Sequence, residues 1–389
     1  MMVSHCFSSS SSSSRAMCAL VLALSILAVQ VSETQALAEG VELPGVLLRD
    51  WPMLTTHNAA TGYMNSSTAF LLPNSDSTLA GIVSSASNPG QLLTNVAKNQ
   101  IGSFSEQLDC GARALIVRPQ VYNDNLIMHH GDVGINVSLA DALEDVISWS
   151  AENQGELVIL GMLYCDGTDC TDTMLDVLSN INITYLDDCS KLVNMTVTEA
   201  RQLGELVEGG SVLAIAQECF DQNYDDSILC RISGGLACTS SSFTSEPFLA
   251  LTSYLRNVTN TSAVDYRDDL LIFQNGHWQY DVSNAITLYI LGSSLLEDSN
   301  DSNVNSFVAG LVSSGVLESI KMLQVDNVCG SGGSTLSRSV QVYSAEQSYR
   351  TAVPEETTAP TPSPASQRCS PSNILLALAI LSVVKNMLM

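Results

Sequence analysis

Two histidines and one arginine are the residues of this chain whose types and spacing could do chemistry. His57 ends the run Met-Leu-Thr-Thr-His that begins at Met53, and His130 ends the run Leu-Ile-Met-His-His that begins at Leu126. Arg118 ends a third apolar run between them. One imidazole could take a proton from an attacking hydroxyl, the other could give one to a leaving oxygen, and the guanidinium could stabilise a phosphoryl group. These residues therefore predict acid–base cleavage of a phosphodiester.

The segments that carry these residues alternate with helix-like stretches. Seven apolar runs predict strands, at residues 53–58, 112–120, 125–130, 156–165, 211–218, 270–275 and 320–326. Helices are predicted at residues 92–98, 138–153, 171–188, 197–207, 284–297 and 305–316. Alternation of this kind is typical of an α/β protein with a mainly parallel sheet. With roughly seven or eight strands, it favours a closed (β/α) barrel over an open sheet.

One strand of such a barrel is hard to find in this pattern, so we expect an irregular TIM-type barrel. The apolar segment 285–291 is partly strand-like but is better read as helix. Catalytic residues of a barrel lie at the carboxyl ends of its strands. Six polar residues occupy such positions here: His57, Arg118, His130, Gln274, Asn275 and Asp326. Their shared position predicts a single catalytic mouth.

Both ends of the chain have the composition of processing signals. Residues 1–38 contain an apolar run and a small-residue cleavage site, which predicts a signal peptide, because the run is short for a membrane-spanning helix. Residues 39–345 are expected to form the barrel domain. Residues 346–368 are rich in Thr, Pro and Ser and predict a stalk. Residues 369–389 form a hydrophobic tail that favours a GPI-anchor signal over a tail anchor.

Sequons and cysteines support a secretory route. Sequons occur at seven asparagines: Asn65, Asn136, Asn182, Asn194, Asn257, Asn260 and Asn300. Eight cysteines lie in the predicted barrel: Cys110, Cys165, Cys170, Cys189, Cys219, Cys230, Cys238 and Cys329. An even number in a secreted protein predicts disulfides but leaves their pairing open. Two groups are spaced like staples within a loop: Cys165 with Cys170, and Cys219 with Cys230 and Cys238. Their spacing does not match a zinc site, so zinc binding by these cysteines is not expected. For the chain as a whole we expect no metal and no cofactor.

The net charge of −25 limits the partners of the chain. A general nucleic-acid binder is excluded, because such proteins need Lys and Arg to neutralise phosphates. The same charge opposes avid docking on anionic bilayers and helps to keep a glycosylated surface protein soluble. We therefore expect a secreted monomer that the GPI anchor holds on the extracellular face of the plasma membrane.

Several segments resemble the X domain of phosphatidylinositol-specific phospholipases C, in the PLC-like phosphodiesterase superfamily. They are residues 56–58 (THN), 107–118 (QLDCGARALIVR) and 125–131 (NLIMHHG). The bacterial, calcium-independent members look most similar. The segment 156–160 (ELVIL) looks like the next strand of that family, and 323–326 (LQVD) resembles its last strand.

The resemblance implies a TIM-like barrel and a two-step cleavage, in which a ring hydroxyl of the substrate attacks phosphorus and forms a cyclic phosphodiester. His57 matches the general base and His130 the general acid. Arg118 matches the arginine that replaces the calcium ion of eukaryotic relatives, and neither Arg118 nor Ile116 can ligate calcium. Asp326 matches the residue that holds His57 in one tautomer. The implied substrate is phosphatidylinositol or a related glycolipid.

The chain departs from the bacterial pattern in the headgroup pocket. An aspartate of the bacterial enzymes falls at Ile116, a basic residue near Leu163 and an inositol-holding arginine near Gln217. Asn275 falls near an inositol-binding aspartate. Asn58 stands where bacterial enzymes have aspartate and eukaryotic relatives have asparagine. The resemblance therefore supports phosphodiester cleavage better than it supports inositol specificity.

Substrate contacts are expected from five side chains: Asn58, Gln217, Gln274, Asn275 and Trp278. Trp278 and the nearby Tyr280 could form an aromatic wall against a sugar ring or a glycerol, or could pack in the core instead. His129 is expected to be structural, because it points to the opposite face of its strand from His130. His277 is expected to be an exposed loop residue.

Three classes of function remain open. The leading one is a surface-anchored phosphoric diester hydrolase of the phosphatidylinositol-specific phospholipase C type. The alternative is a catalytically inactive barrel that binds a phosphorylated headgroup or a glycan at the cell surface, which Ile116, Leu163 and Gln217 motivate. A third is a relative of glycerophosphodiesterases or sphingomyelinase D. Those relatives rely on a carboxylate-bound metal, and no acidic pair accompanies the histidines here.

Overall fold

The computed structural model describes residues 45–73, 75–221, 246–260, 269–280 and 282–352. The predicted signal peptide, the hydrophobic tail and most of the predicted stalk lie outside the described residues, as do Cys230 and Cys238. Within the described part of the chain, no helix is both long enough and apolar enough to cross a membrane.

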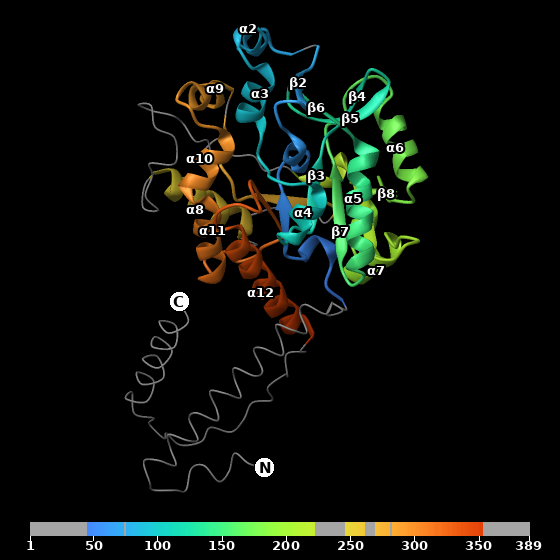
Figure 1. Ribbon diagram of the computed structural model, residues 1–389. Helices are drawn as coiled ribbons and strands as arrows, with labels where there is room; N and C mark the ends of the chain where they lie inside the picture. Colours follow the sequence, from blue (N-terminus) through green and yellow to red (C-terminus); the bar gives the residue numbers. More distant parts are fainter. Residues whose placement is uncertain (1–44, 74, 222–245, 261–268, 281, 353–389) are drawn as a thin grey trace, which may run out of the picture. The chain divides into compact units, whose positions relative to one another are not determined.

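Eight parallel strands form the main sheet, in the order β10, β11, β12, β1, β3, β7, β9, β8. Three of them, β3, β7 and β8, are labelled in Figure 1. Their bounds are β1 Met53–Thr56, β3 Ala114–Val117, β7 Leu157–Met162, β8 Thr184–Leu186, β9 Ser211–Ala216, β10 Phe220–Asp221, β11 Leu271–Asn275 and β12 Met322–Val325. This sheet confirms the predicted α/β fold class. Its order makes β11, β12, β1 and β3 neighbours, so the strand ends that carry most of the candidate residues are adjacent.

Apolar side chains on both faces hold this sheet. Along β3, Ala114 and Ile116 belong to one buried cluster, whereas Leu115 and Val117 belong to another. The same alternation repeats along β7 and β9. Successive residues of a strand point to opposite faces, so one cluster lies inside the sheet and the other packs against the helices. Because strands from β11 to β9 all contribute to the inner cluster, the sheet curves around it.

Most helices pack on the outer face, whereas Val197 and Ala200 of the helix at 197–203 belong to the inner cluster. Several helices differ in extent from the sequence predictions. Their bounds are α2 Ser77–Ser85, α3 Pro89–Ala97, α4 Phe104–Asp109, α5 Leu139–Glu152, α6 Cys170–Asn180, α7 Val197–Leu203, α8 Glu246–Thr259, α9 Val282–Ile290, α10 Leu295–Ser302, α11 Val304–Ser313 and α12 Gly333–Ala352. The helix predicted at 138–153 is confirmed as α5, with the side chain of Ser138 as its N-cap. The single helix predicted at 284–297 is instead α9 and α10, because Gly292 at φ +82° ends the first of them.

A smaller antiparallel sheet, in the order β2, β6, β5, β4, supplies the second histidine. Its strands are β2 Ala69–Leu71, β4 Pro119–Tyr122, β5 Asn125–His130 and β6 Val133–Ser138. The prediction that 125–130 is a barrel strand is therefore wrong, although the segment is a strand. Asn123 and Asp124 both have positive φ and form the two-residue turn that folds β5 back on β4.

The edge strands of the main sheet, β8 and β10, are not hydrogen-bonded to each other in the described part of the chain. The expected closed barrel is therefore not completed by hydrogen bonds. A disulfide joins the two edges instead, because Cys189 follows β8 and its partner Cys219 precedes β10. The helix predicted at 171–188 is wrong at its carboxyl end, where β8 follows α6. A strand of three residues is too short to show a period of its own.

Two more disulfides, Cys110–Cys329 and Cys165–Cys170, link described residues. The local staple expected at Cys165 and Cys170 is confirmed. The grouping of Cys219 with the two cysteines that follow it is wrong, because its partner lies 30 residues earlier in the chain. Pairing across that distance depends on the sheet order and cannot be seen in the spacing.

Candidate active site

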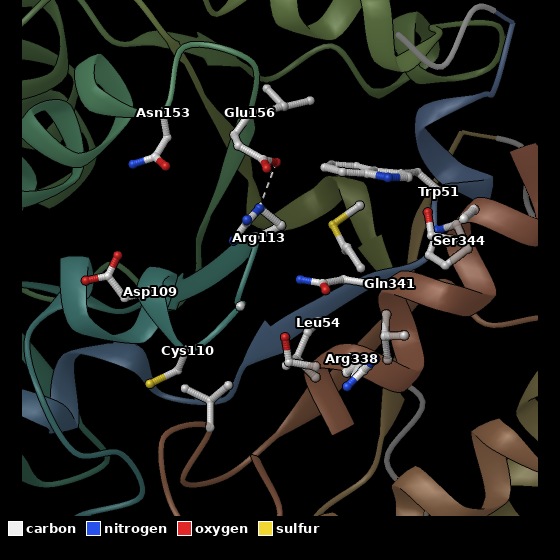
Figure 2. Close-up of a pocket in the computed structure, with 18 of the residues that line it drawn as sticks. Trp51, Leu54, Asp109, Cys110, Arg113, Asn153, Glu156, Arg338, Gln341 and Ser344 are labelled. Atoms are coloured by element: carbon white, nitrogen blue, oxygen red, sulfur yellow. Dashed lines mark hydrogen bonds and ion pairs between the residues drawn. The ribbon is translucent and has the colours of Figure 1, made fainter. Parts of the chain in front are cut away.

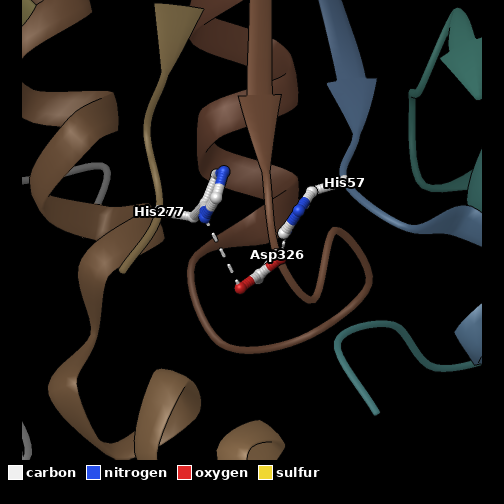
Figure 3. Close-up of side chains that lie close together, drawn as sticks. All are labelled: His57, His277 and Asp326. Carbon is white, nitrogen blue, oxygen red and sulfur yellow. Dashed lines mark hydrogen bonds and ion pairs between the residues drawn. The ribbon is translucent and has the colours of Figure 1, made fainter. Parts of the chain in front are cut away.

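Three neighbouring strands carry polar side chains just past their carboxyl ends (Figure 3). His277 follows β11, Asp326 follows β12 and His57 follows β1. Because these strands are adjacent and parallel, their carboxyl ends meet at one edge of the sheet. All three side chains are buried, with exposed fractions of 0% for His277, 2% for Asp326 and 6% for His57.

His57 and Asp326 form a buried pair. The Nδ1 atom of His57 lies 2.8 Å from Oδ1 of Asp326. An ionised carboxylate only accepts hydrogen bonds, so Nδ1 carries the hydrogen and Nε2 of His57 is left as the acceptor. Asn99 donates from Nδ2 to the other carboxylate oxygen, Oδ2, at 3.1 Å. The imidazole is thus held in the tautomer that a general base requires.

The pKa of Asp326 agrees with an ionised carboxylate. Burial is the largest single influence and works to raise this pKa, whereas the charges of the neighbouring His277 and His57 lower it. Hydrogen bonds from His57 and Asn99 act in the same direction. The net effect is a pKa below the ordinary value of 3.8, so Asp326 is charged near neutral pH.

Asn58 connects the two candidate catalytic histidines. Its Nδ2 atom lies 2.9 Å from Nε2 of His57 and 3.0 Å from Nε2 of His130. Nδ1 of His130 lies 2.7 Å from the carbonyl oxygen of Ala97 and donates to it. In both imidazoles Nδ1 therefore donates to the protein and Nε2 accepts from the same carboxamide. Asn58 has φ +48°, a left-handed conformation that asparagine tolerates better than most residues.

Both imidazoles are neutral near neutral pH. Burial is the main cause that lowers the pKa of His57 to about 4, and the positive potential of His277 adds to it. Asp326 acts in the opposite direction without reversing the shift. Burial also lowers the pKa of His130 to about 3, followed by the charges of Arg118 and His57.

Arg118 shares the site with both histidines. Its charge lowers the pKa of each, and its guanidinium carbon lies 4.7 Å from the centre of the Tyr164 ring. Tyr164 follows β7, and its backbone N–H donates to Oε1 of Gln217 at 2.6 Å. Gln217 lies just past the end of β9. The expected binding residue Gln217 is exposed. Its contact with Tyr164 places it next to the aromatic ring over which Arg118 lies. Tyr164 was not expected from the sequence, because an aromatic residue after an apolar strand is common in any core.

Two of the expected substrate contacts, Gln274 and Asn275, are bonded to the protein itself. Gln274 donates from Nε2 to the carbonyl oxygen of Ser319 at 2.8 Å and accepts from the backbone N–H of Lys321 at 2.9 Å. Asn275 donates from Nδ2 to the hydroxyl of Tyr254 at 3.1 Å. Their side chains are 0% and 1% exposed, and these contacts hold β11 to the segment before β12 and to α8.

The expectation of an aromatic wall is wrong for Trp278. Its side chain is 2% exposed, contacts Phe248 edge to face, and donates from Nε1 to the hydroxyl of Ser302 at 3.0 Å. The core-packing alternative holds for this residue. Tyr280 is also occupied, since its hydroxyl donates to Asp298 at 2.6 Å.

His277 is the main residue of the site that sequence reasoning misplaced. It was expected in an exposed loop, yet its ring is fully buried and stacks on His57, with ring centres 4.2 Å apart and planes 17° apart. A signal was present in the sequence, because His277 lies just past a strand end, as His57 does. His129 does have the structural role that was expected, with its two ring nitrogens within 3.0 Å of the carbonyl oxygens of Gly131 and Tyr164.

The segment 97–100 was also missed, although it contacts the groups around both histidines. Ala97 accepts from His130, and Asn99 donates to Asp326. Gln100 donates from Nε2 to the backbone carbonyl of His57 at 3.0 Å. This segment joins α3 to α4, so one short connection fixes the relative positions of the two imidazoles. The two adjacent carboxamides after an apolar helix were the only hint of this role.

His57, His277 and Asp326 each place a possible ligand atom within 4.8 Å of the others, so a metal ion has to be considered (Figure 3). A histidine binds a metal through a lone pair in the plane of its ring. Two rings stacked 17° from parallel cannot both aim such a lone pair at one ion. Nδ1 of His57 is also committed to Asp326. The arrangement therefore fits a hydrogen-bonded catalytic pair better than a metal centre.

A separate cavity of about 880 Å³ lies at the opposite ends of the strands (Figure 2). It is lined by the starts of β1, β3 and β7 and by α12. Arg113, just before β3, forms an ion pair with Glu156 there, at 2.9 Å. None of the candidate catalytic residues lines this cavity.

No protein-family model matches the sequence, and no curated protein matches it significantly. The chain is similar in structure to bacterial phosphatidylinositol-specific phospholipases C. The enzyme from Listeria monocytogenes is 16% identical, with 76% of this chain and 94% of that chain covered and a TM-score of 0.42. Two variants of the Staphylococcus aureus enzyme are each 12% identical. One match covers 78% of this chain and 96% of that one with a TM-score of 0.48, and the other covers 76% and 94% with a TM-score of 0.47.

Proposed function

We propose that this chain is a phosphoric diester hydrolase of the phosphatidylinositol-specific phospholipase C type. The observation that supports it most is the single amide nitrogen of Asn58, which contacts Nε2 of His57 and Nε2 of His130 at once. Two imidazole nitrogens that face one small group from two sides are placed to act on the two oxygens of a phosphodiester. Arg118 supplies a permanent positive charge to the same site.

The first proposed step transfers the phosphoryl group within the substrate. A hydroxyl of the headgroup attacks phosphorus while Nε2 of His57 takes its proton, and Asp326 stabilises the imidazolium that forms. The bond from phosphorus to the lipid alcohol breaks, and His130 protonates the departing oxygen. The products are a cyclic phosphodiester and the free lipid alcohol. Arg118 binds the non-bridging oxygens through two N–H groups, which is the geometry that suits a guanidinium.

The second proposed step opens the cyclic phosphodiester with water, and the two histidines exchange roles. His130 needs a proton for the first step, although its pKa is about 3 without a ligand. A bound phosphodiester anion favours the imidazolium form and raises that pKa. The carboxamide of Asn58 has to yield its place between the rings, and from there it can donate to a phosphoryl oxygen.

Phosphorus NMR tests this proposal directly. We expect the protein to convert phosphatidylinositol, or a related glycolipid in a panel of phosphodiesters, to a product with a cyclic phosphate signal. His57→Asn and His130→Asn should each lower the rate by at least about a hundredfold. His129→Gln is the matched control, because His129 is a buried histidine bonded only to backbone carbonyls. The proposal fails if either catalytic variant keeps the parental rate, or if no phosphodiester in the panel is cleaved.

A second function, headgroup binding without turnover, is favoured by the residues under the site. Ile116 and Leu163 belong to the inner apolar cluster, with exposed fractions of 1% and 2%. They provide no charged group for a polar headgroup. Calorimetric binding of inositol phosphate to the intact protein, with no cyclic product in the NMR assay, would favour this function over catalysis.

We propose in addition that the protein is secreted as a monomer and held at the extracellular face of the plasma membrane by a GPI anchor. In support, six sequon asparagines are exposed: Asn65, Asn136, Asn182, Asn194, Asn257 and Asn300. Three disulfides join described cysteines, which suits an oxidising compartment. Release from intact cells by an added GPI-cleaving phospholipase, and a smaller mass after glycosidase treatment, are the expected results. Retention of the protein in the cytosol would contradict this proposal.

A further inference from the structure

A third imidazole lies in the site without a role in the proposed reaction. The His277 ring covers one face of the His57 ring, at 4.2 Å between centres. Its Nδ1 donates to the backbone carbonyl of Trp278 at 3.1 Å and lies 3.8 Å from Oδ2 of Asp326. Its Nε2 is buried and has no hydrogen-bond partner among the described residues. A fully buried histidine with an unused nitrogen is costly, so its presence beside His57 calls for an explanation.

We infer that His277 is a positioning residue for His57: its ring fixes the plane of the His57 imidazole against Asp326 and limits the stacked pair to one proton. This inference rests on the proposed role of His57 as general base.

The first part of the role is mechanical. The hydrogen bond from Nδ1 of His57 to Asp326 sets the tautomer. The second hydrogen bond, from Asn58 to Nε2, is lost when the substrate takes the place of the carboxamide, and the ring is then free to rock about the first. The terminal torsion of histidine has a broad energy minimum, so rocking costs little. A flat ring at stacking distance removes this freedom, because a tilted His57 ring would clash with the face of the His277 ring. Nε2 of His57 then keeps one direction, toward the site that Asn58 occupies.

The second part of the role is electrostatic. Four groups face the His57 ring: His277 from β11, Asp326 from β12, Arg118 from β3 and His130 from β5. Only Asp326 favours the protonated form of His57, since the other three are cationic or become so on protonation. If His57 takes a proton from the attacking hydroxyl, a proton on His277 at the same time would place two like charges in contact. Protonation of both stacked rings at once is therefore disfavoured, and His277 lowers the proton affinity of His57.

Two substitutions separate the two parts of the role. His277→Phe keeps a flat ring against His57 but removes both nitrogens, whereas His277→Ala removes the ring. The test is to titrate the His57 ring nitrogens by NMR in the intact protein, a measurement that does not depend on turnover. In His277→Phe we expect the His57 pKa to rise by roughly one unit, because a neighbour that lowers this pKa is removed. In His277→Ala we expect the Nδ1–H signal of His57 to broaden, because the ring is no longer held.

Kinetics provide a second readout. His277→Phe should move the acid limb of the kcat/KM profile to higher pH, by the same number of pH units as the NMR titration. It should change kcat by less than about threefold. His277→Ala should lower kcat about tenfold or more with little change in KM, because near-attack geometry is lost. His129→Gln serves as the control for the loss of a buried histidine, and it should leave the His57 titration where it is.

The outcomes separate this inference from the proposed function. An unchanged His57 titration and an unchanged Nδ1–H signal in both variants would overturn the inference, whatever the activity. A shifted titration in a protein that cleaves no phosphodiester would uphold the positioning role and overturn the proposed function. If His277→Ala fails to fold, the titration of His277→Phe still decides the electrostatic part.

Discussion

Asn99 donates a hydrogen bond from Nδ2 to Oδ2 of Asp326 at 3.1 Å, and this contact ties the connection after α3 to the strand end beneath His57. The backbone strengthens the same junction, since the N–H of Asn327 donates to the carbonyl of Asn99 at 2.7 Å. Two residues earlier, the carbonyl of Ala97 accepts from His130. One short segment therefore contacts both the proposed base pair, through Asp326, and the proposed acid, His130.

Asn99→Ala is expected to lower kcat about tenfold and to change KM little. The substitution leaves Oδ2 of Asp326 without its buried donor, so the carboxylate holds His57 less firmly. Asn95→Ala is the matched control, because Asn95 lies on α3, just before the connection that carries Asn99, and its side chain accepts from the nearby Gln91 instead of contacting Asp326. Steady-state kinetics on both variants decide the matter, and equal kcat values for the two would contradict the role of Asn99.

The pH optimum of kcat is expected to lie above that of kcat/KM by about one unit or more. The profile of kcat/KM reports the free protein, in which the pKa of His57 is about 4 and that of His130 is about 3. A bound phosphodiester anion stabilises either imidazolium and raises both pKa values in the complex. Initial rates on a soluble phosphodiester between about pH 2.5 and 8 give both profiles. Coincident optima would mean that substrate charge does not reach the imidazoles.

The free energy of unfolding is expected to fall as the pH drops below about 6.5, the ordinary histidine pKa. Between that pH and the lowered pKa values of His57 and His130, the unfolded chain binds more protons than the folded one. Each histidine then contributes a slope of up to about 1.4 kcal/mol per pH unit, and the penalty is absent above pH 6.5.

Urea unfolding of the parent and of His130→Asn at about pH 5 and pH 7 isolates the share of this histidine, because the carboxylates are common to both proteins. The variant should lose less stability on acidification than the parent. The same loss in both proteins would show that His130 keeps its ordinary pKa in the folded state.

Arg118→Lys is expected to lower kcat/KM about a hundredfold while the net charge is kept. A lysine offers a point charge where the guanidinium offers two parallel N–H groups to phosphoryl oxygens. Arg113→Lys is a matched control at the other end of β3, where Arg113 lies over Trp149 much as Arg118 lies over Tyr164. The control should lose stability through its ion pair with Glu156 and keep its turnover. Full activity of Arg118→Lys would show that the proposed mechanism does not need the guanidinium.

Sequence patterns predicted the parts of the fold that repeat a regular period. Buried strands such as β7 and β9 show as continuous apolar runs, and α5 shows as an amphipathic helix with a cap at Ser138. The strand β8 was not predicted, because three residues are too few to show an alternation of apolar and polar side chains. The segment 125–130 was correctly predicted to be a strand but was assigned to the wrong sheet. The turn at Asn123 and Asp124 decides which strand it pairs with.

The same limit applies to the site. His57, Arg118, His130 and Asp326 were found from residue type at strand ends, which is local information. The stacking of His277 on His57 depends on β11 and β1 lying on either side of β12, an order that spacing along the chain does not reveal. Trp278 was misplaced for the related reason that an aromatic residue near a strand end can face either a pocket or a helix.

The disulfide Cys110–Cys329 is expected to support both stability and activity. It closes a span of 219 residues and anchors the loop just past Asp326, so replacing both cysteines by serine should cost up to about 5 kcal/mol through chain entropy. The position of Asp326 would also loosen, and kcat should fall a few-fold. Replacing Cys165 and Cys170 is the control, because that disulfide spans 5 residues and its removal should cost about 2 kcal/mol at most. Equal losses of unfolding free energy in the two double variants, measured by urea unfolding, would show that the long cross-link does not constrain the unfolded chain.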